Sequence, residues 1–120
     1  MKRITATYAA LGYEPYEWFV ASSPPPMAPV VKAVSDSRVG VIATGGIYAA
    51  GQVAFTYRDD TTYRAIPSDI NVNDLRATHF AYDLDDARKD INVVFPIDAL
   101  QKLEKENIIG ELAPYFFTCM

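Results

Sequence analysis

The ten residues at positions 38–47, Arg-Val-Gly-Val-Ile-Ala-Thr-Gly-Gly-Ile, constrain the fold of this chain more than any other stretch. Val39, Val41 and Ile42 are β-branched, and the other apolar or neutral residues of the run are small. A short, nearly continuous apolar run bounded by polar residues and glycines is typical of a buried β-strand. Because apolar side chains would point to both faces, the run predicts a sheet covered on both sides, which favours a parallel α/β arrangement.

The run ends in a corner formed by Thr44, Gly45 and Gly46. Two glycines in a row permit a positive φ and let another backbone or a ligand approach closely. In open α/β sheets, ligands bind outside the carboxyl ends of the strands. We therefore expect the backbone N–H groups of this corner to bind a substrate carboxylate or another anion. The alternative is a tight turn that serves packing alone.

The size and charge of the chain exclude several classes of protein. Its 120 residues suffice for one globular domain with a sizeable core. A formal net charge of -4 argues against binding nucleic acid through the phosphates. No apolar run approaches the ~20 residues of a membrane span, and the apolar stretch at 8–11 is too short for the core of a signal peptide. We expect a cytoplasmic protein that binds neither nucleic acid nor membrane.

The chain has one cysteine, Cys119, and one histidine, His79. These counts exclude a disulfide within the chain and a multi-histidine metal cage, so no metal site is expected. Cys119 lies in an apolar run with no base beside it in sequence. A buried structural cysteine is therefore favoured over a nucleophile with a lowered pKa.

Composition divides the chain into an N-terminal arm with a proline linker, 1–28, and an α/β domain, 29–120. The prolines at 24–26 indicate an extended linker, and Pro29 could begin a turn or two of helix at 29–34. A short helix is plausible at 5–11. The arm could pack on its own domain or on a partner chain, because aromatic residues are enriched at interfaces. Its aromatic residues are Tyr8, Tyr13, Tyr16, Trp18 and Phe19.

The remaining strands are short. We expect a loop over the strand end at 47–56, an edge strand at 63–67 that Pro67 closes, and a further strand at 75–80. The aromatic run at 115–119 predicts a buried strand, and with no crossover helix after it that strand would be an exposed edge. The pattern predicts a small α/β fold with a mostly parallel sheet and few helices, half of a larger doubly wound α/β unit.

One helix is strongly indicated, at 96–106. Ile97, Leu100 and Leu103 fall on one face of it, and Asp98 lies in its first turn. Asn107 is a good candidate for the left-handed residue that ends it. A single helical turn is expected within the acidic segment 82–90. Residues expected to return to the core after the long helix are Ile108, Ile109, Leu112 and Ala113.

The most promising polar group is His79 with Tyr82 and Asp83. A histidine can serve as acid or base near neutral pH, the aspartate could hold its tautomer, and the tyrosine could donate to a substrate carboxylate. The alternative is a histidine that forms structural hydrogen bonds at a strand end. Arg64 could bind a substrate carboxylate in a bidentate manner, although a surface salt bridge is its more common role.

Five segments, in their order and spacing, resemble the selenoprotein B family of glycine/sarcosine/betaine/D-proline reductases, most closely the D-proline reductase type. They are the residues at 38–46, 63–69, 79–83, 90–100 and 109–113. The resemblance covers 29–120 and corresponds to the amino-terminal half of the reductase B subunit.

The resemblance implies an oxidoreductase that cleaves a C–N bond of a small amine or amino acid with electrons from a dithiol. It also implies a partner subunit whose pyruvoyl group binds the substrate amine, and a selenocysteine or cysteine nucleophile in the B subunit. That nucleophile lies beyond the part of the pattern that this chain covers, and Cys119 precedes its place. The chain itself is expected to hold no cofactor.

Two interpretations follow from the resemblance. In the first, the chain contributes the corner and His79 to a site that a pyruvoyl-bearing subunit or the second half of the enzyme completes. In the second, it is a non-catalytic binding or assembly module that retains the fold. A homo-oligomer is compatible with both, and a small-molecule binding domain of unrelated chemistry is a weaker third reading.

Overall fold

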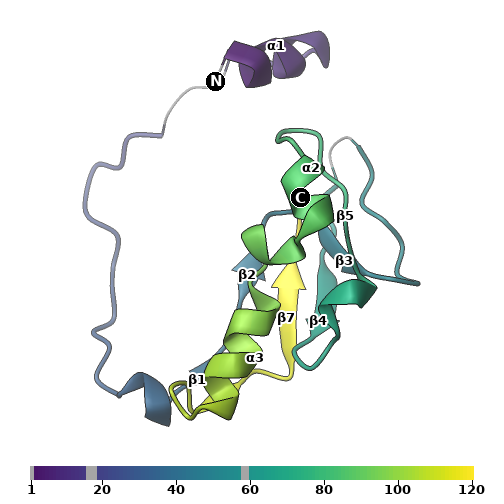
Figure 1. The fold of residues 1–120 in the computed structure, drawn as a ribbon. Helices are drawn as coiled ribbons and strands as arrows, with labels where there is room; N and C mark the ends of the chain where they lie inside the picture. Colours follow the sequence, from purple (N-terminus) through teal and green to yellow (C-terminus); the bar gives the residue numbers. More distant parts are fainter. Residues whose placement is uncertain (1, 16–18, 58–59) are drawn as a thin grey trace. The chain divides into compact units, whose positions relative to one another are not determined.

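The structure is a computed structural model that describes residues 2–15, 19–57 and 60–120 (Figure 1). Tyr16 and Trp18 of the aromatic arm lie outside the described residues. The chain divides into two compact units, Met1–Val31 and Lys32–Met120.

The first unit contains helix α1, Lys2–Ala10, close to the helix predicted at 5–11. It ends at Gly12, whose φ of +81° is the left-handed conformation that commonly terminates helices. The rings of Tyr8 and Tyr13 meet edge to face with centroids 5.6 Å apart. Residues 19–31 form neither helix nor strand and expose apolar side chains such as Phe19 and Met27.

The helix predicted at 29–34 is wrong. The first helical turn of the second unit is the 3₁₀ helix η1, Val34–Asp36, after Ala33 in an extended conformation. Val30 and Val31 are β-branched, which lowers helix propensity. The Ser37 hydroxyl donates to the carbonyl of Ala33 at 2.8 Å and closes the short turn.

The run at 38–47 forms three short strands rather than one. They are β1, Arg38–Val39, β2, Ile42–Ala43, and β3, Ile47–Ala49. Strand β1 pairs in parallel with β6, Glu111–Leu112, and β2 pairs in parallel with β7, Tyr115–Thr118. The pairing shifts by two residues between these ladders. Pro114, which has no N–H to donate, stands at the shift and interrupts the ladder.

Strand β7 lies in the middle of a three-stranded sheet ordered β2-β7-β4 (Figure 1). Strand β4, Arg64–Pro67, pairs antiparallel with β7 and is the predicted edge strand. The expectation that 115–119 is an exposed edge is therefore wrong, because both sides of β7 are paired. Its side chains alternate: Phe116 and Thr118 are fully buried, whereas Phe117 is 43% exposed.

The expectation of a sheet covered on both faces is also wrong for this unit. Ile42 of β2 is 82% exposed. Val39, Val41 and Ala43 on the opposite face pack against the core. The sheet is therefore half-buried, with one apolar face on the core and one open face.

Strand β3 pairs antiparallel with β5, Leu75–Ala77, within the predicted strand at 75–80. The expected loop at 47–56 therefore begins only after Ala49. Ile47 is fully buried, which explains why the chain extends here rather than turning at once. With both parallel and antiparallel pairs, the sheets are mixed, and the expectation of a small α/β domain with few helices is confirmed.

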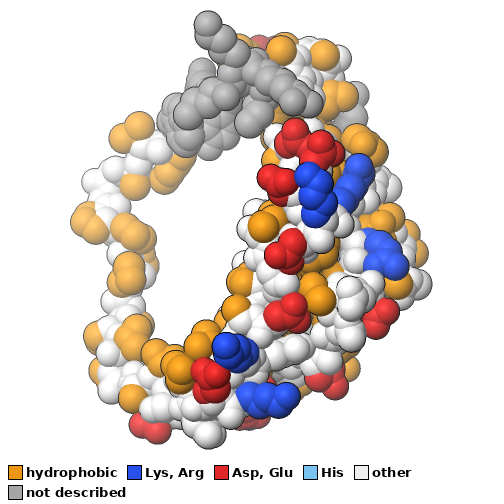
Figure 2. All heavy atoms as spheres, in the orientation of Figure 1, with side chains coloured by type: hydrophobic (Ala, Val, Ile, Leu, Met, Phe, Trp, Pro, Cys, Tyr) orange, Lys and Arg blue, Asp and Glu red, His pale blue; other side chains and the backbone are white. Residues whose placement is uncertain are grey.

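Helix α3, Ile97–Lys105, is the helix predicted at 96–106 and packs its apolar face on the sheet. Asn107 has a φ of 56° and ends it, as expected. Ile109 returns to the core, but Ile108 is 52% exposed, contrary to expectation. Acidic and basic side chains alternate over the face formed by the helices (Figure 2). The shorter helices are η2, Val72–Asp74, α2, Asp85–Lys89, and η3, Ile91–Val93.

The core of the second unit is formed by side chains from all three sheets and from α2, η3 and α3. The rings of Phe95 and Phe116 meet edge to face at 5.9 Å. The largest fully buried side chains are Phe95, Phe116, Ile47, Ile66, Ile97 and Thr118.

Candidate functional site

The corner at 44–46 is clamped between two backbone segments. The Gly46 N–H donates to the carbonyl of Cys119, and the Thr78 N–H donates to the carbonyl of Gly46, both at 3.0 Å. Gly46 has a φ of +66°, and a Cβ there would lie 1.9 Å from the Thr78 carbonyl oxygen. This position therefore requires glycine, both for its left-handed backbone and for the close approach of the segment after β5.

Tyr82 fixes the other glycine of the corner. Its hydroxyl donates to the Gly45 carbonyl oxygen at 2.7 Å. Burial raises the pKa of Tyr82, so the phenol keeps its proton and remains a donor near neutral pH. A Cβ on Gly45 would meet Val94 at an ordinary 3.5 Å. The structural role of Gly45 is therefore to present its carbonyl oxygen to Tyr82, because the space around it would admit a Cβ.

His79 lies beside the corner, half-buried. Its Nδ1 accepts a 2.9 Å hydrogen bond from the Ala81 N–H, and the Thr44 backbone forms a second hydrogen bond with the ring. Because Nδ1 accepts, the neutral imidazole carries its proton on Nε2. Its centroid lies 4.7 Å from that of Tyr82. Burial lowers the pKa of His79, and the bond to Thr44 opposes this only in part. The ring is therefore neutral at pH 7.

Asp83 lies at the start of α2. It is exposed, and its Oδ1 accepts from the Asp85 N–H at 3.1 Å. The sequence predicted that an aspartate could hold the tautomer of His79, but the Nδ1 of the ring accepts from the Ala81 N–H. The structure thus brings His79 and Tyr82 to the corner and gives Asp83 a bond within its own turn.

Two donors at the corner take no part in this network. Thr44 is exposed, and in the described part of the chain neither its hydroxyl nor the Gly45 N–H has a hydrogen-bond partner. The Gly46 N–H already donates to the Cys119 carbonyl. The thiol of the same Cys119 is half-buried and lies 3.7 Å from the Ala43 carbonyl oxygen, so it is not a group of the corner. The corner can therefore offer one hydroxyl and one amide to an anion.

Arg64 is committed to the loop at 53–62. Its Nε donates to the Val53 carbonyl at 2.7 Å, and its Nη1 donates to the Thr62 hydroxyl at 2.7 Å. The guanidinium carbon also lies 4.2 Å from the centroid of the Phe55 ring. The side chain is only 12% exposed. These contacts give the guanidinium a structural task in the loop that precedes β4.

Asp60 organises the same loop and was not singled out from the sequence. Its side chain is 4% exposed and accepts from the N–H groups of Thr56 and Thr62, at 2.8 and 2.9 Å, and from the Thr62 hydroxyl. The Thr62 hydroxyl, followed by these backbone bonds, holds the pKa of Asp60 well below its usual range. An aspartate followed two residues later by a threonine is an Asx-turn signal that could have identified it.

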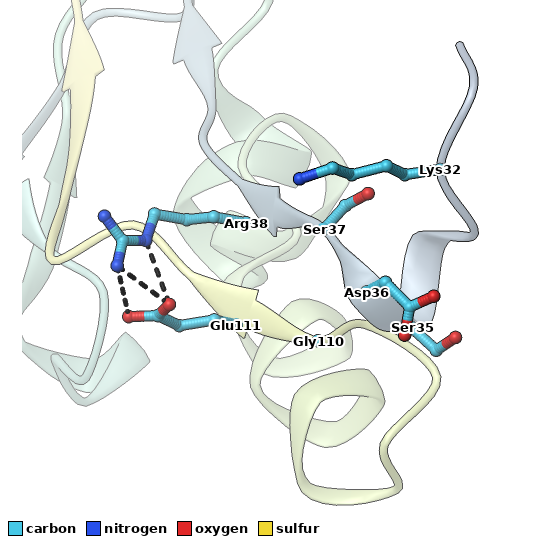
Figure 3. A pocket seen from close by; sticks show the side chains of 7 residues that line it. All are labelled: Lys32, Ser35, Asp36, Ser37, Arg38, Gly110 and Glu111. Atoms are coloured by element: carbon cyan, nitrogen blue, oxygen red, sulfur yellow. Dashed lines mark hydrogen bonds and ion pairs between the residues drawn. The ribbon is translucent and has the colours of Figure 1, made fainter.

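A second polar surface lies around the start of β1, where a shallow depression has a volume of about 400 Å³ (Figure 3). Arg38 and Glu111 form a bidentate pair across it, with Nε–Oε2 and Nη2–Oε1 distances of 3.0 Å. Both side chains are more than half exposed. The other lining residues are Lys32, Ser35, Asp36, Ser37 and Gly110.

Among the described residues, none of the helices is long and apolar enough to cross a membrane.

Comparison with known proteins identifies similar chains. The family described as glycine/sarcosine/betaine reductase selenoprotein B matches residues 21–120. D-proline reductase subunit gamma of Acetoanaerobium sticklandii is 39% identical over 99 residues, which are 82% of this chain and 41% of that protein. Sarcosine reductase complex component B subunit beta of Peptoclostridium acidaminophilum is 32% identical, over 76% of this chain and 22% of that protein.

A more distant relative is glycine reductase complex component B subunit gamma of Symbiobacterium thermophilum, 27% identical over 77% of this chain and 23% of that protein. The chain thus spans less than half the length of each of these curated relatives. No solved structure matches it.

Proposed function

The chain belongs to the glycine/sarcosine/betaine reductase selenoprotein B family, and on that premise we propose that it is a component of a dithiol-dependent reductase complex. Its part is to hold the carboxylate of a small amino acid at Thr44 and Gly45. The observation that carries this proposal is a pair of donors without a partner among the described residues, at a corner whose other polar groups are hydrogen-bonded.

The substrate class follows from the chemistry of the corner. Glycine, sarcosine, betaine and D-proline, which appear in the names of the relatives, all carry a carboxylate on the carbon bonded to nitrogen. The Thr44 hydroxyl and the Gly45 N–H can donate to that shared group, since a corner of backbone donors suits an anion. D-proline is the favoured substrate, because the D-proline reductase subunit has 39% identity to this chain.

In the reaction, the bond between the α-carbon and nitrogen breaks. The dithiol is oxidised to a disulfide, and its two electrons and two protons are added to the two halves of that bond, so that D-proline opens to 5-aminopentanoate. The corner has donors for a carboxylate, but the described side chains that contact it, such as His79 and Tyr82, are not electrophiles that could form a bond to an amine. This fits a pyruvoyl group on a partner subunit, which would supply an electrophile for the amine.

In this arrangement His79 and Tyr82 act as positioning residues. Tyr82 holds the Gly45 carbonyl, and His79 holds the backbone of Thr44, so the two residues that would bind the carboxylate are held in place. Proton transfer by His79 would first require the release of a backbone bond from one of its nitrogens. Asp83 supports the start of α2, and Arg64 supports the loop before β4.

The second candidate is a non-catalytic assembly module. It is favoured by the apolar side chains of residues 19–31, of which Phe19 is 87% and Val31 is 86% exposed. Exposed apolar groups of this kind commonly mark contacts with another protein.

Co-expression tests the proposal. A tagged form of the full chain is co-expressed with the pyruvoyl-bearing subunit of a D-proline reductase, with and without a polypeptide that supplies the nucleophile. We expect co-purification, and dithiol-dependent 5-aminopentanoate only when all components are present. Product that is formed equally without this chain would overturn the reductase role. Co-purification without product in the full mixture would favour the assembly module.

A further inference from the structure

The backbone of residues 37–43 forms its ladder hydrogen bonds on one side only. Every second carbonyl oxygen accepts a bond from the segment that contains β6 and β7. The four pairs are Glu111 to Ser37 at 3.1 Å, Ala113 to Val39 at 2.8 Å, Phe117 to Val41 at 2.9 Å and Cys119 to Ala43 at 2.9 Å. Successive residues of an extended strand turn their backbone groups to opposite edges. The N–H and C=O groups of Arg38, Gly40 and Ile42 therefore point to the other edge.

That other edge is open in the part of the chain that the structure describes. Strand β1 pairs only with β6, and β2 pairs only with β7, beside which it lies in Figure 1. The side chains along the edge leave it accessible, since Ile42 is 82% exposed. An open edge with unpaired N–H and C=O groups is a template for another strand. Its only charge, on Arg38, is already paired with Glu111 (Figure 3).

From these observations we infer that the edge formed by Arg38, Gly40 and Ile42 pairs antiparallel with the same edge of a second copy of the chain. A twofold axis passes beside Gly40, so that Gly40 faces its own copy and Arg38 faces Ile42 of the second copy. The two residues of a hydrogen-bonded antiparallel pair exchange both of their backbone bonds. The three opposed pairs thus form about six hydrogen bonds, two for each pair. Such an interface is isologous and closed.

Repulsion between like charges, together with the bond between Thr44 and His79, selects this register. An axis at Arg38 would place two like charges directly opposite each other, which destabilises a sheet. An axis at Ile42 would place Thr44 opposite Gly40 of the second copy and would need the backbone of Thr44 for the bonds between the copies. That backbone is already bonded to His79. With the axis at Gly40, the two arginines lie about 14 Å apart along the strands, at about 3.4 Å for each residue. Each arginine remains paired with Glu111 of its own copy.

The side chains also fit this register. Arg38 directs its side chain to Glu111 of β6, on the paired side of β1, so the side chain does not block a strand at the open edge. On the opposite face, Val39 of one copy lies beside Val41 of the other. Both valines already pack against the core, so the apolar layer of one copy continues into the next.

The test measures the oligomeric state of the full chain and of matched variants. Light scattering after size exclusion gives the mass as a function of concentration, to be compared with 13.3 kDa for one chain. Ile42→Lys places a charge at the edge, and Gly40→Pro removes the N–H at the axis. Val53→Lys is the matched control, because Val53 is 79% exposed and its carbonyl bonds to Arg64 of β4, which lies across β7 from β2. Circular dichroism checks that each variant is folded.

We expect twice the mass of one chain for the unmodified protein and for Val53→Lys, and loss of the dimer in Ile42→Lys and Gly40→Pro. In the unmodified chain, the amides of Gly40 and Ile42 should exchange with solvent more slowly as concentration rises. A monomer at all concentrations would overturn the inference. So would a dimer that survives both edge variants, or one in which these amides exchange as in the monomer. An edge that is protected only when another protein is added would assign it to that protein instead.

Discussion

The hydroxyl oxygen of Tyr82 lies 2.7 Å from the carbonyl oxygen of Gly45, although the two residues are 37 positions apart in sequence. This bond, together with the hydrogen bonds of His79 and Gly46, joins the end of the strand run to the segment after β5. A flexible pair of glycines thereby becomes a fixed corner. Each of these contacts can be tested separately.

Removal of the Tyr82 hydroxyl should weaken the corner. Tyr82→Phe leaves the half-buried Gly45 carbonyl without its donor, and the net contribution of one such hydrogen bond is about 1 kcal/mol. We expect urea denaturation to give a free energy of unfolding lower by roughly that amount. Tyr115→Phe is the control, because Tyr115 is 54% exposed and should tolerate the same change. Equal effects of the two substitutions would contradict the assigned role of the hydroxyl.

Gly46 should be the least replaceable glycine. Gly46→Ala combines a left-handed backbone, which costs roughly 1–2 kcal/mol for other residues, with a Cβ placed 1.9 Å from the Thr78 carbonyl oxygen. Gly51 also has a positive φ, of +92°, but a Cβ there meets nothing within 4 Å. Gly51→Ala therefore measures the cost of the left-handed backbone alone, without a steric clash. Thermal unfolding should show a clearly larger loss for Gly46→Ala, and equal losses would disprove the close packing at Thr78.

The pH dependence of stability should report the burial of His79. Its pKa in the folded chain is lowered from the ordinary value of 6.5. Below pH 6.5 the unfolded chain therefore binds a proton more readily than the folded one, and stability falls until the folded pKa is passed. Above pH 6.5 both forms are neutral and this group adds no pH dependence.

His79→Gln should remove this loss of stability between pH 6.5 and the folded pKa, while the effects of carboxylates remain. Because His79 is the only histidine in the sequence, its ring proton can be followed directly by NMR. A titration midpoint at or above 6.5 would contradict the burial and backbone contacts described for the ring.

Asp60 should stabilise the loop at 53–62 in its charged form. Its pKa is lowered by the Thr62 hydroxyl and by backbone N–H groups, so its contribution is complete above the unfolded pKa of 3.8 and is lost as pH falls through the folded pKa. Asp60→Asn should lower the unfolding midpoint at pH 7, and the difference from the unmodified chain should shrink below pH 3.8. Asp69→Asn, an exposed control, should change little. A difference that persists unchanged at low pH would argue against the ionised carboxylate.

Local signals in the sequence were sufficient for several elements. The apolar spacing of Ile97, Leu100 and Leu103 predicted α3, and Asn107 ends it as expected. A short alternating run before Pro67 predicted β4 as an edge strand. In each case the residues that decide the structure are neighbours in the chain.

The division of the run at 38–47 could not be predicted in this way. It depends on Pro114, which belongs to a partner segment distant in sequence. The central place of β7 likewise depends on β2 and β4 both pairing with it. Burial on both faces was inferred from side-chain type alone, whereas Ile42 faces the open side of the sheet.

The candidate site was predictable only in part. The diglycine corner and His79 were identified by residue type, and the structure places them side by side. The group that holds Nδ1 of His79 is a backbone N–H, which no side-chain pattern can indicate. The guanidinium of Arg64 is taken up by carbonyl groups of the preceding loop for the same reason.

The most direct test of the account is a titration of the ¹⁵N-labelled full chain with D-proline, followed by NMR. If Thr44 and Gly45 hold the carboxylate, D-proline should shift the Gly45 amide, while pyrrolidine, the same ring without a carboxylate, should not. Thr44→Val should weaken the D-proline shift. A Gly45 amide that does not move with D-proline, or that moves equally with pyrrolidine, would contradict the proposed carboxylate site.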